Sequence, residues 1–109
     1  MYLDGSNHNG VVLTVPGDTR HAIVFVHTET CPYCVQTKPV FEEFCRLYSS
    51  QFACYMVDVG DERGRAFLDK QRLRVDSVPK FLKYVGGYLT SSELRERTVE
   101  GMRQFMMMM

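Results

Sequence analysis

The chain contains no tryptophan, and its 13 acidic residues balance its 13 lysines and arginines. It has no apolar run near the roughly 18 residues that a membrane-spanning helix needs. It also has no basic cluster of the kind that nucleic acids or anionic lipids attract. The first ten residues lack the basic and apolar segments of a secretory signal. We therefore expect no membrane or nucleic-acid partner, and a cytoplasmic monomer.

The composition is that of one folded domain. Of the 109 residues, 45% are hydrophobic and 24% are charged, which is typical of a globular chain with a true core. We therefore assign residues 1–109 to a single domain. With only four cysteines, a disulfide framework is not expected in a reducing compartment, where a Cys-x-x-Cys pair is catalytic or binds metal.

Helical and strand patterns alternate along the chain. Strands are predicted at 11–15, 22–27, 52–59 and 80–85, and a further strand at Tyr88 follows the hairpin turn Gly86-Gly87. Helices are predicted at 34–49 and 61–73, with Asp61 as an N-cap. A last helix begins after Thr98, or earlier after Ser91 or Ser92, and residues 106–109 are expected to fray. This order predicts a mixed α/β layer architecture.

The tetrapeptide Cys31-Pro32-Tyr33-Cys34 stands between a buried strand and a helix. Unpaired N–H groups and the positive end of the helix dipole favour the thiolate of Cys31, the expected nucleophile. Pro32 suits the first helical turn, and Tyr33 is expected to shape the approach to the sulfurs. Cys34, one turn further, is expected to be buried and to resolve the mixed disulfide. The same spacing is half of a zinc site, but no second pair of ligands follows.

From Ala22 to Phe105 the chain resembles the thioredoxin superfamily. The resemblance is carried by the buried strand before the cysteine pair, by Pro39 five residues after Cys34, by Ser77-Val78-Pro79 and by Gly86-Gly87. The letters Cys-Pro-Tyr-Cys are those of glutaredoxins, whereas Lys38-Pro39 and the residues after it look like thioredoxins. The resemblance implies a thioredoxin-like fold, a central mixed β-sheet flanked by helices. Because residues 1–20 lack helical periodicity, the family's first helix is expected to be absent or replaced by a β-hairpin.

The resemblance also implies a substrate loop. A cis bond between Val78 and Pro79 would lay the main chain of Val78 alongside a substrate next to Cys31. Four positions depart from the family. Thr30 replaces the tryptophan that precedes the thioredoxin cysteines, and Phe25 replaces the buried acid of thioredoxins. Met56 replaces the lysine that partners this acid, and Thr28 replaces the glutathione-binding lysine of glutaredoxins.

The expected function is that of a dithiol–disulfide oxidoreductase that reduces protein disulfides. It would need no bound cofactor or metal, and glutathione or a thioredoxin reductase would restore the dithiol. A glutathione-dependent glutaredoxin and a disulfide isomerase or oxidase are the related alternatives. The alternative from another class is a binding module, either a dimer that bridges an iron–sulfur cluster through Cys31 or a scaffold that holds zinc.

Three further residues lie outside the cysteine pair and the Val78–Pro79 loop. Cys45 and Cys54 are interpreted as small hydrophobic residues of the core, with a regulatory or dimerising role as the alternative. His27 is interpreted as a partly exposed histidine at a strand end, with proton transfer in place of the lost acid as the alternative.

Overall fold

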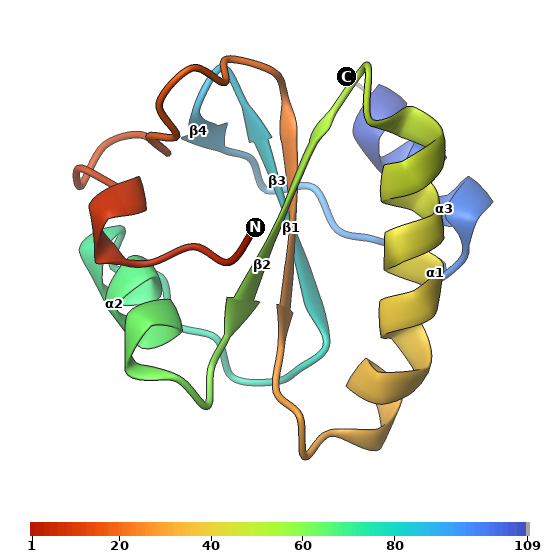
Figure 1. Ribbon diagram of the computed structural model, residues 1–109, viewed down its shortest axis with the longest axis horizontal. Helices are drawn as coiled ribbons and strands as arrows, with labels where there is room; N and C mark the ends of the chain where they lie inside the picture. Colours follow the sequence, from red (N-terminus) through yellow and green to blue (C-terminus); the bar gives the residue numbers. More distant parts are fainter. Residues whose placement is uncertain (109) are drawn as a thin grey trace.

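A four-stranded mixed sheet in the order β2-β1-β3-β4 forms the centre of the protein (Figure 1). The computed structural model describes residues 1–108. Strand β1 (Ala22–His27) pairs in parallel with β2 (Ala53–Asp58) and antiparallel with β3 (Lys80–Val85), and β4 (Tyr88–Leu89) pairs antiparallel with the end of β3. All six residues of β1 are buried, which explains their continuous apolar run.

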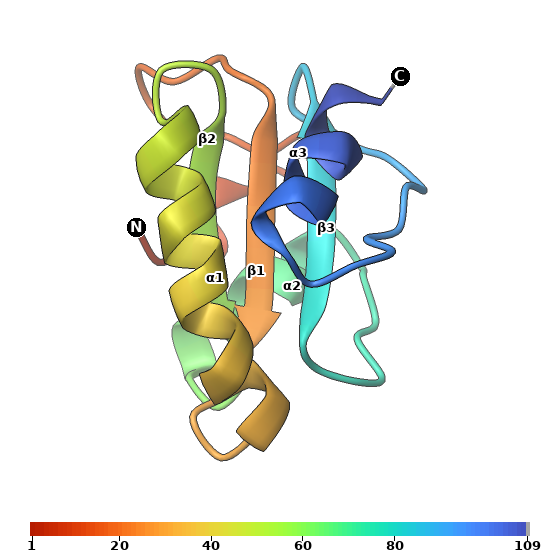
Figure 2. The same ribbon diagram turned by 90° about the vertical axis from the view of Figure 1, so that its right-hand side faces the viewer.

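Helices cover both faces of this sheet. Helices α1 (Pro32–Tyr48) and α3 (Val99–Met107) lie on one face, and α2 (Glu62–Lys70) lies with the N-terminal segment on the other (Figures 1 and 2). Each face has its own apolar cluster. Phe44 and Met102 belong to the α1–α3 side, and Phe67 and Tyr84 belong to the α2 side. The expectation of a mixed sheet flanked by helices is confirmed.

Side chains cap the starts of all three α-helices described. The Asp61 side chain accepts the N–H of Arg63 at the start of α2, and Thr98 accepts the N–H of Gly101 at the start of α3. The alternative start of α3 at Ser91 or Ser92 is therefore wrong. Helix α3 also continues to Met107, beyond the point where fraying was expected, while Met109 lies outside the described residues.

Residues 1–21, all of which the structure describes, contain no α-helix, as expected. They hold a 3₁₀ turn, η1 (Gly5–Asn7), and two isolated bridges, His8 with Leu13 and Val15 with Asp18. The strand expected at 11–15 is wrong, because the Asn9 side chain accepts the N–H groups of Val11 and Val12 and holds them in a turn. Local side-chain bonds have replaced a sheet ladder here.

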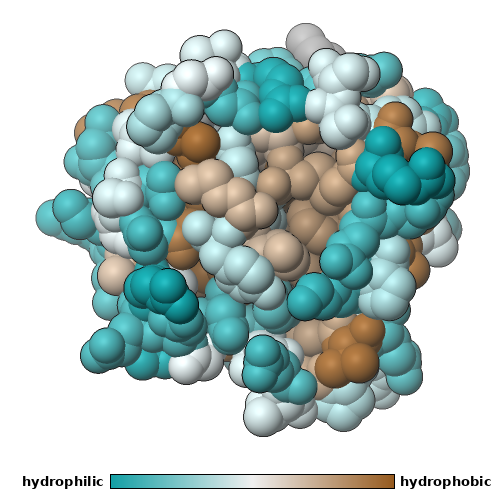
Figure 3. Space-filling view, viewed as in Figure 1, coloured by the Kyte–Doolittle hydropathy of each residue, from teal (hydrophilic) through white to brown (hydrophobic). Residues whose placement is uncertain are grey.

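The surface is mainly hydrophilic at its rim. In the view of Figure 3, moderately hydrophobic residues occupy the middle of the face, over β2 and the N-terminal segment. No helix within residues 1–108 has the length and apolar character needed to cross a membrane.

Candidate active site

The end of β1 delivers the chain to the N-terminus of α1, where Cys31 is the N-cap residue. Its Sγ accepts the main-chain N–H of Cys34 at 3.2 Å, so the sulfur occupies the place that a capping oxygen usually fills. Pro32 follows in the first turn, where its missing N–H has no partner to lose. The helix therefore begins on a sulfur, as the sequence predicts.

The two thiols of the pair have opposite environments. Cys34 is buried, with 2% of its surface exposed, while Cys31 is partly exposed, and both are free thiols. The hydrogen bond from the Cys34 thiol lowers the pKa of Cys31 against the opposing effect of burial, helped by main-chain N–H groups and the charge of Arg97. Burial, with the hydrogen bond to Cys31, raises the pKa of Cys34 to about 11. The pair thus has one accessible thiol with a lowered pKa and one shielded thiol with a raised pKa.

The Val78–Pro79 loop lies against the accessible thiol. The peptide bond between these residues is cis, as the resemblance implies, and the Sγ of Cys31 lies 3.7 Å from the carbonyl oxygen of Val78. The structure therefore brings together residues that are 47 positions apart in the chain.

Arg97 is a charged residue of this site that the sequence analysis did not single out. Its guanidinium lies 5.8 Å from the ring centre of Tyr33, whose side chain is 63% exposed. From there its charge helps to lower the pKa of Cys31 and opposes part of the rise in the pKa of Cys34. Arg97 comes directly before the N-cap of α3, and no local pattern could have shown that this loop returns to the start of α1.

His27 is buried, which contradicts its interpretation as a partly exposed histidine. Only 4% of its surface is exposed, because its ring stacks on Phe25 at 4.9 Å and meets Tyr2 at 5.7 Å. Its Nε2 atom is shielded from solvent and has no hydrogen-bond partner within residues 1–108. Burial lowers the pKa of His27 more than the charge of Asp58 raises it, which favours the neutral ring.

His27 and Cys34 line the same cavity of about 270 Å³. The other ionisable side chains that line it are Glu29, Lys38 and Glu42. The position of the buried acid of thioredoxins is filled by Phe25, and its neighbour on β2 is Met56. Of the groups that line the cavity, His27 is the one whose ordinary pKa lies near neutrality.

Cys45 and Cys54 form a disulfide, so their interpretation as free core residues is wrong. Cys45 is on the last turns of α1 and Cys54 is on β2, with Cα atoms 6.0 Å apart, within the ordinary range for a bridge. The chain reverses between these two elements, and this brings positions nine residues apart into contact. Within residues 1–108, no three His, Cys, Asp or Glu side chains are grouped as a metal site requires.

The sequence matches no protein-family model and no curated protein. Solved structures do match. The Trx4 domain of ERdj5 has a TM-score of 0.70 at 17% identity, over 94% of this chain and 88% of that one. Human ERp44 matches in form I (TM-score 0.76, 18% identity) and in its zinc-bound form (0.69, 20%), each over 96% of this chain. The chain spans only 28% and 30% of those two ERp44 chains. These matches show that the chain has a thioredoxin-like fold. In this chain, the fold places a Cys-x-x-Cys pair at the start of α1.

Proposed function

We propose that this domain is a thiol–disulfide oxidoreductase that reduces disulfides in protein clients, with Cys31 as the nucleophile and Cys34 as the resolving thiol. The observation that carries the proposal is the division between the two thiols. Cys31 is accessible with a lowered pKa, and Cys34 is buried with a pKa raised to about 11. Cys31 is therefore the thiol that can attack an external disulfide as a thiolate. Cys34 lies beside it and can attack the resulting mixed disulfide.

The first step uses the exposed sulfur. The Cys31 thiolate attacks one sulfur of the client disulfide, the client S–S bond breaks, and one client thiolate leaves. A mixed disulfide between Cys31 and the client remains. The carbonyl oxygen of Val78 lies 3.7 Å from Cys31 Sγ. This proximity supports a role for the cis-Pro79 loop, together with Pro32 and Tyr33, in aligning the client.

The second step requires Cys34 to lose its proton. We assign the acceptor role to His27, because it shares a cavity of about 270 Å³ with Cys34 and has an unpartnered ring nitrogen. A cavity of this size has room for water, through which the proton would pass from Cys34 to His27. The Cys34 thiolate then attacks Cys31 Sγ, the intramolecular disulfide forms, and the second client thiolate leaves and takes up a proton. The client gains two electrons, and glutathione or a thioredoxin reductase returns two electrons to the domain.

Single-cysteine variants test the proposal. Cys31→Ser is expected to abolish reduction of a disulfide-linked peptide, and Cys34→Ser is expected to accumulate a covalent mixed disulfide visible by intact mass. Loss of the Cys45–Cys54 disulfide through Cys45→Ala/Cys54→Ala is the matched control and should leave both steps intact. Normal turnover by Cys31→Ser would refute the assignment.

A disulfide oxidase or isomerase is the second candidate, and the Cys45–Cys54 disulfide favours it. Persistent disulfides are typical of oxidising compartments, where client disulfides are made rather than removed. The midpoint of the Cys31–Cys34 couple in glutathione buffers separates the two, since reductants and oxidants of this kind span about −270 to −120 mV.

A further inference from the structure

The outer edge of β3 is left open over half of its length. Strand β4 pairs only with Tyr84 and Val85. The last hydrogen bond on this edge is the one that the Thr90 N–H donates to the carbonyl oxygen of Lys83, at 2.9 Å. Beyond Thr90 the chain leaves the sheet and runs as a loop to the start of α3 (Figure 2). The residues of β3 nearest the Val78–Pro79 loop therefore pair with β1 on one side and have no strand on their outer side.

The alternation of β3 shows which main-chain groups face this open edge. Because the carbonyl of Lys83 points outward to Thr90, the main-chain groups of Phe81 point outward as well, and those of Lys80 and Leu82 point to β1. Within residues 1–108, no main-chain hydrogen bond engages Phe81 on the outer side. Phe81 therefore offers one N–H and one C=O in the geometry that an added strand requires.

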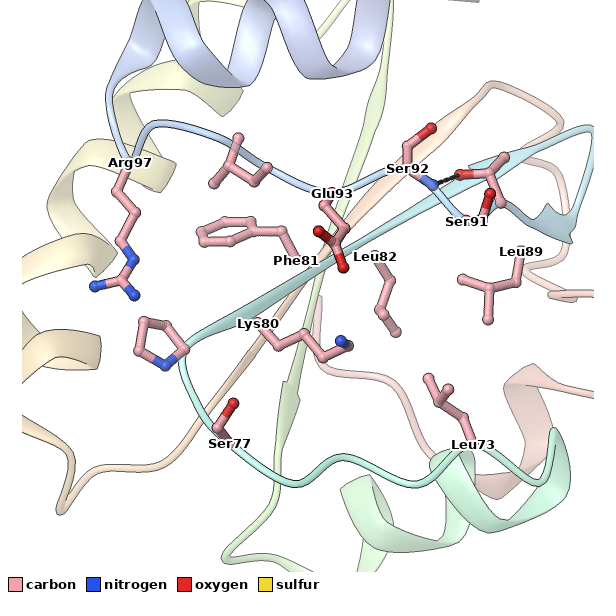
Figure 4. Close-up of a pocket in the computed structure, with 13 residues that line it drawn as sticks. Leu73, Ser77, Lys80, Phe81, Leu82, Leu89, Ser91, Ser92, Glu93 and Arg97 are labelled. Atoms are coloured by element: carbon pink, nitrogen blue, oxygen red, sulfur yellow. Dashed lines mark hydrogen bonds between the residues drawn. The ribbon is translucent and has the colours of Figure 1, made fainter.

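A groove of about 320 Å³ lies between this edge and the segment 91–97. Figure 4 shows Lys80 and Glu93 projecting into it from its two sides, with Arg97 at the end nearest α1. Pro79 also lines the groove, so the groove is continuous with the loop that contacts Cys31. Its polar lining has two cationic side chains, one anionic side chain and four hydroxyl-bearing side chains, those of Ser77, Thr90, Ser91 and Ser92.

We propose that this groove binds an extended segment of the client polypeptide as an added strand on β3, with main-chain hydrogen bonds to Phe81. The proposal rests on the oxidoreductase function, because it places client chain beside the reactive thiol. Phe81 is three residues beyond Val78, about 10 Å along a strand, so the paired client residue lies about three positions from the client cysteine. Main-chain pairing accepts many sequences. The excess of cationic over anionic lining favours a segment with acidic side chains.

The test uses the Cys34→Ser protein joined through Cys31 to a short synthetic peptide of cysteine followed by alternating threonine and glutamate. The peptide is supplied as an activated disulfide, so that the adduct forms whether or not the domain turns over clients. The same protein capped with 2-mercaptoethanol is the reference. The peptide is expected to slow hydrogen exchange at the Phe81 amide about tenfold, while the Lys80 and Leu82 amides stay unchanged because they already pair with β1.

Methylation of the peptide nitrogens makes the test specific for strand pairing. Methyl groups on every second nitrogen should remove the protection of Phe81 in one register and leave it in the other. Equal exchange at Phe81 in the peptide adduct and in the capped protein would overturn the proposal. Protection of Phe81 already in the capped protein would also overturn it, since the segment 91–97 would then close the edge itself.

A substitution in the groove gives an independent reading. Ser92→Trp fills the groove from the outer segment and is expected to lower kcat/KM for a disulfide-linked peptide about tenfold, while reduction of a small aromatic disulfide stays unchanged. Arg95→Trp, on the same segment but not lining this groove, should change neither rate. A Ser92→Trp protein that reduces the peptide normally would contradict the proposal. If the domain reduces neither substrate, the proposed function fails, and the exchange test still decides whether the edge binds the peptide.

Discussion

The Cys45–Cys54 disulfide closes a short loop between α1 and β2. The loss of stability expected when this disulfide is reduced follows from the length of that loop. The two residues are nine positions apart. On the chain-entropy model, closing such a loop removes about 9 cal/mol/K from the unfolded chain, which is worth ~2.7 kcal/mol at 25 °C. A domain of this size has a free energy of unfolding of roughly 5–15 kcal/mol, so the reduced protein is expected to stay folded.

The measurement is guanidinium unfolding of the Cys31→Ser/Cys34→Ser protein, with and without a phosphine reductant. This background retains Cys45 and Cys54 alone, so that intact mass reports their state without interference. Reduction is expected to lower the free energy of unfolding by about 2–3 kcal/mol, and to lower Tm by about 10 °C, from the usual entropy of unfolding per residue. The reductant removes the bond without removing a side chain, so no cavity adds to the loss.

The matched control carries Cys45→Ala and Cys54→Ala in the same background. Its stability should not respond to the reductant at all. The predicted stabilisation by the disulfide would be wrong if intact mass found both thiols free in air-oxidised protein. It would also be wrong if reduction changed the free energy of unfolding by less than about 0.5 kcal/mol.

Three other predictions follow from single side chains. Arg97→Gln is expected to raise the pKa of Cys31, since it removes a charge that stabilises the thiolate. The ultraviolet absorbance of the thiolate, followed against pH, measures this pKa, and Arg95→Gln is the control. Equal pKa shifts in the two variants would contradict the prediction. Because burial lowers the pKa of His27 from 6.5, the unfolded chain binds the extra proton. The stability contributed by the neutral ring is therefore present above about pH 6.5 and lost as pH falls below it. Chemical unfolding at several pH values should show this loss, and it should flatten in His27→Gln, whereas an unchanged slope would oppose it. Gly64→Ala would press a Cβ atom against the main-chain oxygen of Asp58, at the end of β2. The variant is expected to lose about 3 kcal/mol of stability in thermal unfolding. A loss of stability below about 1 kcal/mol would show that α2 can shift.

The parts of the fold that depend on local periodicity were predictable from the sequence. The buried strand at 22–27, the strand at 80–85 and the helix cap at Thr98 are confirmed at those residues. In each case the residues that determine the helix or strand lie within it or directly beside it. A strand buried on both faces also has a continuous run of apolar residues, which is not typical of a loop. The cysteine pair at a helix start is of the same kind, because Pro32 and the following helical pattern mark the position.

The burial of His27 and the position of Arg97 depend on contacts between distant segments, whereas the error at 11–15 came from a nearby side chain. The burial of His27 depends on Tyr2 and Phe25 packing around it, and its own strand-end position gave no sign of this. Arg97 acts on Cys31 because the loop before α3 passes over the start of α1. Residues 11–15 have an apolar pattern suited to a strand, but the Asn9 side chain takes the N–H groups that a partner strand would need.

The Cys45–Cys54 disulfide also bears on where the protein works and in which direction. Persistent structural disulfides are rare in reducing compartments, so this one weighs against the expectation of a cytoplasmic location. If the protein works in an oxidising compartment, the Cys31–Cys34 couple would exchange disulfides with clients that are still being oxidised. Titration in glutathione buffers decides between a reducing and an oxidising compartment. If the Cys45–Cys54 disulfide stays closed at a cytosolic redox potential of roughly −220 to −320 mV, it is compatible with reductase activity in the cytoplasm. If Cys45 and Cys54 are instead reduced over that range, the disulfide belongs to a more oxidising environment, and the oxidase or isomerase candidate takes precedence.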